Sequence, residues 1–170
     1  MLGLDVEIVR PLGIGPMRLW SDAFPEGGEI PLEYTKDGYN TSPPFRWADL
    51  PPDTRELALI FEGVTPATHE PWVHWLRVQD LGGSRGLTPG VQAHARARTT
   101  TALLQGSNSL GNVGYDGPQG TIGRKFRYRI RLLALDEPIE PGLDKERLEK
   151  IIRGHVLEEA ELHAVYERHG

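Results

Sequence analysis

Glycine and proline divide this chain into short apolar runs, and this punctuation restricts the folds open to it. The 14 prolines and most of the 20 glycines lie in the first 142 residues. Short apolar runs bounded by such residues are typical of strands joined by turns. A length of 170 residues with 38% hydrophobic content is enough for one hydrophobic core. The sequence therefore predicts a mainly β protein with a single domain over residues 1–170.

Two runs show contrasting strand patterns. Residues 57–61 are apolar at every position, as expected of a central strand that is covered on both faces. In residues 126–132, aromatic and aliphatic side chains alternate with three arginines. Successive side chains of a strand point to opposite faces, so we expect Phe126 and Tyr128 on the inward face and the arginines outside.

One helix is predicted late in the chain, over residues 144–153. Its first residue, Asp144, can cap the amino end, and Leu148, Ile151 and Ile152 form an apolar stripe. The tail, residues 155–168, is ambiguous between a short helix and a strand, and we favour a helical turn followed by a strand at residues 161–166.

A polar, glycine-rich stretch over residues 82–101 predicts a long loop. Its basic residues are more typical of a solvated surface than of an anion site, and we assign them no role. They are Arg85, His94, Arg96 and Arg98.

Composition excludes several classes of function. A formal charge of −5 and a pI near 5.7 argue against a nucleic-acid partner, because such proteins carry a basic excess. The chain has no cysteine, so a thiolate metal site or a disulfide is excluded. The six histidines lack a metal-binding spacing, and the motifs of the common enzyme classes are missing. We expect no metal, no cofactor and no enzymatic activity.

The amino terminus and hydropathy indicate the compartment. Residues 1–13 include Asp5 and Glu7 and lack the basic start and apolar run of a signal peptide. No apolar stretch approaches the roughly 18 residues that span a bilayer. We expect a cytoplasmic protein without an integral membrane segment, whose contact with lipid would be peripheral.

Several segments, in order along the chain, resemble the phosphatidylethanolamine-binding protein family, which includes Raf kinase inhibitor protein. The resemblance implies a β-sandwich of two antiparallel sheets of Greek-key type, with a few peripheral helices. It also implies a small surface pocket for anionic groups such as phosphate, acetate or a phosphoethanolamine headgroup. The segments are residues 21–24 with 30–31, 37–47, 72–75, 106–118, 127–136 and 154–157 leading to Tyr166.

The pocket residues of the family carry over position by position. Its Asp-Pro-Asp-Ala-Pro segment falls on residues 62–66, the histidine of its Trp-x-His motif falls on His74, and its His-Arg-Tyr segment falls on residues 126–128. The two acids become Glu62 and Val64, and the histidine becomes Phe126. The family's proline run is replaced by residues 119–121, and Thr65–Pro66 falls where the family tends to have a cis peptide bond.

These changes predict a more apolar pocket. We interpret Val64 and Phe126 as a coupled exchange, because a carboxylate left beside a phenyl ring would be an unpaired buried charge. The polar groups that remain are Glu62, His74, Tyr115 and Tyr128, supported by backbone donors from residues 114–120. We expect a cavity that prefers a less charged ligand, or one with an apolar tail.

Each candidate also has a structural interpretation. A lone histidine between tryptophans is often a hydrogen-bonded core residue, and a tyrosine can fill the edge of a core. Glu62 beside His74 would be either a structural ion pair or an acid/base pair.

The leading hypothesis is a non-enzymatic binding module for a small anionic or amphipathic ligand. A protein-interaction regulator that inhibits a kinase or protease is the alternative, and a weak hydrolase or isomerase is the third reading. The sequence leaves open whether the protein forms a homodimer.

Overall fold

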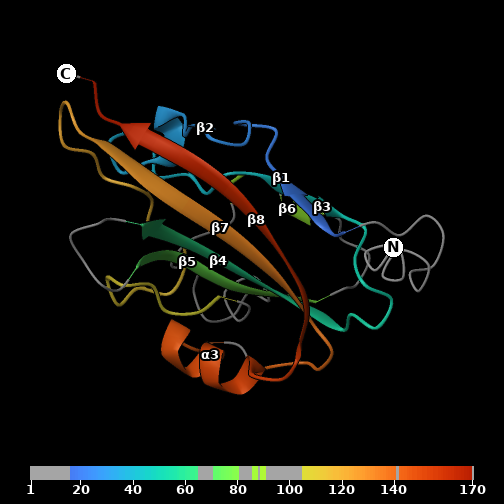
Figure 1. Cartoon of the computed structure of the whole chain (residues 1–170). Helices are drawn as coiled ribbons and strands as arrows, with labels where there is room; N and C mark the ends of the chain where they lie inside the picture. Colours follow the sequence, from blue (N-terminus) through green and yellow to red (C-terminus); the bar gives the residue numbers. More distant parts are fainter. Residues whose placement is uncertain are drawn as a thin grey trace.

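A computed structural model describes residues 16–64, 71–80, 86–87, 89–90, 105–140 and 142–169. Its strands form two open sheets (Figure 1). The small sheet has the order β1-β3-β6, with β1 at Arg18–Trp20, β3 at Phe45–Ala48 and β6 at Gly86–Leu87. The large sheet has the order β2-β8-β7-β4-β5, with β2 at Gly28–Glu29, β4 at Glu56–Val64, β5 at Trp72–Asp80, β7 at Lys125–Leu135 and β8 at Val156–Glu167.

The predicted mainly β fold with two sheets is confirmed. Neighbouring strands are antiparallel, except that the short β2 runs parallel to β8. A 3-10 turn, η1 at Leu32–Tyr34, follows β2. In the described part of the chain no helix is long and apolar enough to cross a membrane.

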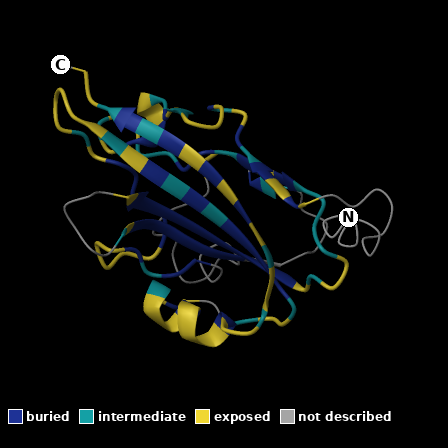
Figure 2. Cartoon of the chain, in the orientation of Figure 1, coloured by how far each residue is buried: buried dark blue, intermediate teal, exposed yellow. Residues whose placement is uncertain are grey.

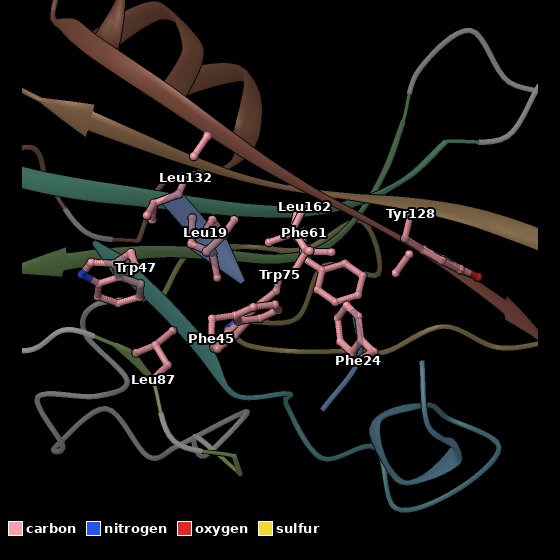
Figure 3. Packing of buried hydrophobic residues seen from close by; sticks show 14 of the residues in the cluster. Leu19, Phe24, Phe45, Trp47, Phe61, Trp75, Leu87, Tyr128, Leu132 and Leu162 are labelled. Carbon is pink, nitrogen blue, oxygen red and sulfur yellow. The ribbon is translucent and has the colours of Figure 1, made fainter. Parts of the chain in front are cut away.

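Two apolar clusters lie on opposite faces of the large sheet. The first packs side chains of the small sheet against those of the large sheet, and Phe45, Phe61 and Trp75 lie at its centre (Figure 3). The second fills the space between the large sheet and α3 (Lys145–Ile152), which lies below the sheet in Figure 1. The large sheet is therefore the middle layer.

The strand patterns match this layering. All of β4 is buried except its last residue, Val64, whereas β7 alternates between buried and more exposed positions (Figure 2). Tyr128 and Ile130 face the first cluster, as the alternation predicts. The continuous apolar run therefore marks the strand that lies between two apolar layers.

The predicted late helix is confirmed as α3. The Asp144 side chain accepts a hydrogen bond of 2.8 Å from the backbone N–H of Arg147, and Leu148 and Ile152 are buried. Ile151, which we expected in the apolar stripe, is 43% exposed. The stripe is therefore narrower than predicted.

The prediction for the tail was right about the strand at residues 161–166, which lies within β8, and wrong about the helical turn before it. No helical turn precedes the last strand in the described structure, because β8 begins at Val156 and pairs with β7 along nearly its whole length. Residues 158–161 are good helix formers, but the ladder with β7 and the burial of Ala160, Leu162 and Ala164 override that local preference.

Two other predictions concern residues that are largely or wholly outside the described part. Most of the predicted loop at residues 82–101, including its basic residues, lies there, although Gly86–Leu87 forms β6. The Thr65–Pro66 bond also lies outside the described residues.

A buried ion network joins the large sheet to α3. The carboxylate of Glu62 is fully buried and accepts hydrogen bonds from Arg129 of β7 and from Lys145 of α3, the latter at 2.7 Å. Arg131 lies 3.7 Å from the same carboxylate. Burial raises the pKa of Glu62, but the hydrogen bonds and charges of Lys145 and Arg129 outweigh that effect and hold it below its usual value.

This network should make stability depend on Glu62 and on acid. Because the pKa is lowered on folding, the stabilisation is present above the unfolded pKa and is lost as pH falls through the folded pKa. We expect Glu62→Gln to lower the free energy of unfolding at pH 7 by about 2–3 kcal/mol. Breaking a fully buried ion pair would lower it by more, but the cations around Glu62 are partly exposed to solvent. Urea unfolding between pH 3 and pH 7 measures the free energy of unfolding as a function of pH. If that free energy fell as steeply with acid in the variant as in the parent, the prediction would be contradicted.

Candidate functional site

His74 occupies a β-bulge in β5. Phe61 of β4 pairs with Trp75, and the next residue, Glu62, pairs with Val73, so His74 is the extra residue without a partner in this ladder. A bulge changes the direction of a side chain, and such irregularities are frequent at functional sites. The His74 ring contacts Phe61 at 5.8 Å between centroids, so it lies on the same face of the sheet as Trp75.

Two hydrogen bonds fix His74 to the loop that follows β6. The backbone N–H of Asp116 donates to the carbonyl of His74 at 3.0 Å, and Nδ1 of the ring lies 2.8 Å from the carbonyl oxygen of Asp116. A carbonyl oxygen can only accept, so Nδ1 must carry a proton. In the neutral ring Nε2 is therefore a lone-pair acceptor.

The imidazole is neutral over the physiological range. Burial lowers the pKa of His74 to about 4, although the hydrogen bond and the charge of Asp116 oppose the shift, and the positive charge of Lys36 adds to it. His74 is 8% exposed. Its Nε2 is thus an acceptor with no hydrogen-bond partner among the described residues.

The carboxylate of Asp116 is held by amide groups. Asn108 donates to it at 2.7 Å, Asn112 at 3.0 Å and Asn40 at 3.4 Å, while the ammonium group of Lys36 lies 3.7 Å away. The Asn40 side chain also accepts a bond of 2.7 Å from the N–H of Gly117. These contacts support an architectural role for Asn40 and make the loop a rigid wall beside His74.

A surface cavity of about 260 Å³, which we call the His74 cavity, lies beside this wall. Its buried polar side chains are His74, Tyr128 and Asp116, and Lys36 brings a positive charge. Trp72 and Leu110 are 47% and 48% exposed and form an apolar edge. The full lining is Lys36, Gly63, Trp72, His74, Leu110, Asp116, Gly117, Gln119, Phe126 and Tyr128.

Tyr128 and Tyr115 have different roles. The Tyr128 ring packs 5.5 Å from that of His74, and its hydroxyl points away from the aromatic cluster (Figure 3). In the described structure that hydroxyl has no hydrogen-bond partner, and burial raises the pKa of Tyr128 so that it stays protonated. Tyr115 is wholly buried outside the cavity, and its hydroxyl donates to the carbonyl of Tyr34. Tyr115 therefore does not line the candidate site.

Glu62 and Val64, which we predicted as pocket residues, also do not line the His74 cavity. Glu62 points to the α3 side, and Val64 is 43% exposed on the outer face with Arg127, beside a separate groove. The residue between them, Gly63, faces the cavity, because a Cβ atom there would lie 3.3 Å from Nε2 of His74. Gly63, rather than Glu62, is therefore the β4 residue that lies beside His74 in the cavity.

Phe126 lies in the cavity wall as predicted, but its coupling to Val64 was wrong. The two side chains are on opposite faces of the sheet, so neither compensates for the other. Phe126 instead contacts Arg124, whose guanidinium lies 5.8 Å from the ring centre. The expected backbone donors are also occupied, since Gly117 donates to Asn40 and Gly120 donates to Asp37.

Sequence reasoning missed several lining residues, namely Lys36, Gly63, Trp72, Leu110 and Asp116. Asp116 lies in a quoted family segment but was not singled out, and Lys36 carries no recognisable signal. Chemically, the cavity offers an acceptor, a hydroxyl, an ammonium group and the bonded carboxylate of Asp116. Among the described residues, no group of three or more histidine and carboxylate side chains could hold a metal ion.

The protonation of His74 provides a direct check. We expect its ring to titrate near pH 4 in an NMR pH series, and stability to fall as pH drops from 6.5 toward 4 because the unfolded chain then binds the extra proton. Gly63→Asp should raise the pKa of His74 by about one unit or more, because a carboxylate favours imidazolium. Gly63→Asn is the uncharged control of the same shape. Titration of the parent ring at its ordinary pKa would contradict the buried, neutral state.

Comparisons with known proteins identify the family and agree with the fold. Residues 20–167 match the family described as phosphatidylethanolamine-binding protein. A "UPF0098 protein" of Methanothermobacter thermautotrophicus is 39% identical over 154 residues, which cover 89% of this chain and 99% of the relative. Another, from Chlamydia muridarum, is 35% identical with the same coverage.

Two solved structures are also similar. The crystal structure of a putative phosphatidylethanolamine-binding protein homologue from Chlamydia trachomatis is 33% identical, has a TM-score of 0.76, and covers 90% of this chain and 98% of the other. The structure of E. coli YbcL, titled a new member of the mammalian family, has a TM-score of 0.78 at 21% identity, covers 91% of this chain and 99% of the other, and shows the shared fold. The chain belongs to the phosphatidylethanolamine-binding protein family.

Proposed function

We propose that this protein binds a small anionic or amphipathic ligand in the His74 cavity. The observation that carries the proposal is the pair of polar groups at the cavity wall, Nε2 of His74 and the hydroxyl of Tyr128, which belong to buried residues but have no hydrogen-bond partner among the described residues. A ligand that bonds to both would gain two hydrogen bonds without displacing a protein partner.

The rest of the lining supports an amphipathic occupant. Lys36 favours a negative charge, whereas Trp72, Leu110 and Phe126 offer apolar surface around it. Pockets for drug-sized ligands measure roughly 300–1,000 Å³, so about 260 Å³ suits a phosphate or a headgroup rather than a whole lipid. The name of the family adds phosphoethanolamine to the candidates.

We propose binding without turnover. The acid/base pair considered from the sequence is not assembled, because the Glu62 carboxylate contacts Lys145 and Arg129. Nδ1 of His74 bonds to a neutral backbone carbonyl, which stabilises an imidazolium less than a carboxylate would. A protein-interaction role has no comparable observation in its favour.

Two tyrosine variants test the site. Tyr128→Phe removes a hydroxyl with no protein partner in the described structure, so binding of phosphate or phosphoethanolamine should weaken about three- to tenfold with stability unchanged. Tyr115→Phe removes the bond to the Tyr34 carbonyl, so the free energy of unfolding should fall by about 1 kcal/mol with binding unchanged. Calorimetric titration and urea unfolding measure the two effects. Equal affinity of the parent and Tyr128→Phe for the ligand would show that the ligand binds outside the His74 cavity.

A further inference from the structure

The hydrogen-bonding state of His74 restricts the chemistry of its ligand, if the proposed binding function holds. Nδ1 is committed to the carbonyl of Asp116, so Nε2 presents a lone pair to the cavity. Gly63, the nearest residue on β4, offers no side-chain donor. The ligand atom that reaches Nε2 must therefore bring a hydrogen.

The surrounding charges favour an anion as the source of that hydrogen. The charged groups that act on His74 are Asp116, which has the stronger effect, and Lys36. Tyr128 packs against the His74 ring, and Tyr166 and Asp37 act on Tyr128 in turn. The Asp116 carboxylate is already surrounded by amide donors and Lys36, and Tyr128 is neutral. Arg124 lies at the Phe126 edge and has no ion pair in the described part of the chain. Asp37 is likewise engaged, because it accepts hydrogen bonds from the N–H of Gly120 and from the hydroxyl of Tyr166. With both carboxylates bonded to protein donors, Lys36 and Arg124 are left to attract an anion.

We infer that the His74 cavity selects phosphate groups that keep a proton, namely inorganic phosphate and phosphomonoesters, over sulfates, carboxylates and phosphodiesters. A protonated phosphate donates its hydroxyl to Nε2, while its charged oxygens face Lys36 and accept from Tyr128. A sulfate or a phosphodiester brings only acceptors to Nε2, so two lone pairs would face each other. The phosphodiester of an intact phospholipid would be disfavoured for the same reason.

The primary test compares methyl phosphate with methyl sulfate at pH 5.5. Both are then mainly monoanions of similar size that differ by one hydroxyl, since a phosphomonoester has its second pKa near about 6. We expect methyl sulfate to bind at least about tenfold more weakly, which corresponds to about 1.4 kcal/mol. NMR shifts of the His74 and Tyr128 rings report binding in this cavity, and Nε2 should stay unprotonated in the complex.

Raising the pH separates this inference from simple charge attraction. Between pH 6 and pH 8 methyl phosphate loses its hydroxyl proton and gains charge, so its affinity should fall toward tenfold per pH unit. Attraction to Lys36 alone predicts tighter binding of the dianion. Inorganic phosphate keeps a hydroxyl over this range and should lose much less affinity.

Two further pairs identify the source of the phosphate and of the donor. Phosphocholine and glycerophosphocholine both lack an N–H group, so tighter binding of phosphocholine would favour a soluble monoester over a lipid headgroup. Phosphoethanolamine should bind about as well as phosphocholine. A large advantage for phosphoethanolamine would show that an ammonium group donates to Nε2 and would overturn the inference.

The outcomes distinguish this inference from the proposed function. Equal affinity for methyl phosphate and methyl sulfate, with shifts of the cavity rings, would overturn the inference and keep the binding function. Absence of binding by every probe would overturn both. In His74→Gln, whose amide can present an N–H group, the ratio of the affinities for methyl phosphate and methyl sulfate should fall toward one. Tyr128→Phe should instead weaken the binding of both ligands and leave that ratio unchanged.

Discussion

The reciprocal hydrogen bonds between His74 and Asp116 hold the candidate site together. One bond joins the backbone of edge strand β5 to the loop at residues 105–118, and the other fixes the imidazole ring. Both depend on the bulge, because without the extra residue in β5 the alternation of side chains would direct His74 away from the first cluster. The sheet irregularity, the tautomer and the cavity wall are thus parts of one arrangement.

Successive side chains of strand β4 point to opposite faces of the sheet, and this separates the residues of the scaffold from those of the site. Phe61 and Gly63 face the aromatic cluster and the cavity, whereas Glu62 faces α3. The buried ion network therefore fixes the far layer without placing a carboxylate next to His74. Because a glycine occupies the cavity side, the space beside Nε2 stays open, and its walls come from β5, β7 and the Asp116 loop.

Periodicity predicted the fold better than it predicted the site. The continuous apolar run of β4, the alternation of β7 and the capped α3 follow directly from residue spacing, but the start of β8 does not, since its pairing with β7 overrides local helix preference. In the site, a shift of one residue exchanges the two faces of a strand, so Glu62 and Val64 were assigned to the cavity in place of Gly63. Tyr115 and Tyr128 cannot be separated by sequence, because only packing decides which hydroxyl finds a partner.

The glycine at position 63 determines the character of His74. A carboxylate at that position would lie against Nε2, favour the imidazolium form and make the ring a donor to anions. With glycine there, burial dominates, the ring stays neutral, and Nε2 accepts. A lower charge on the ring favours a lower charge on the ligand, which agrees with the apolar contribution of Phe126 to the same wall. The glycine at position 63 thus leaves the ring as a hydrogen-bond acceptor toward the cavity.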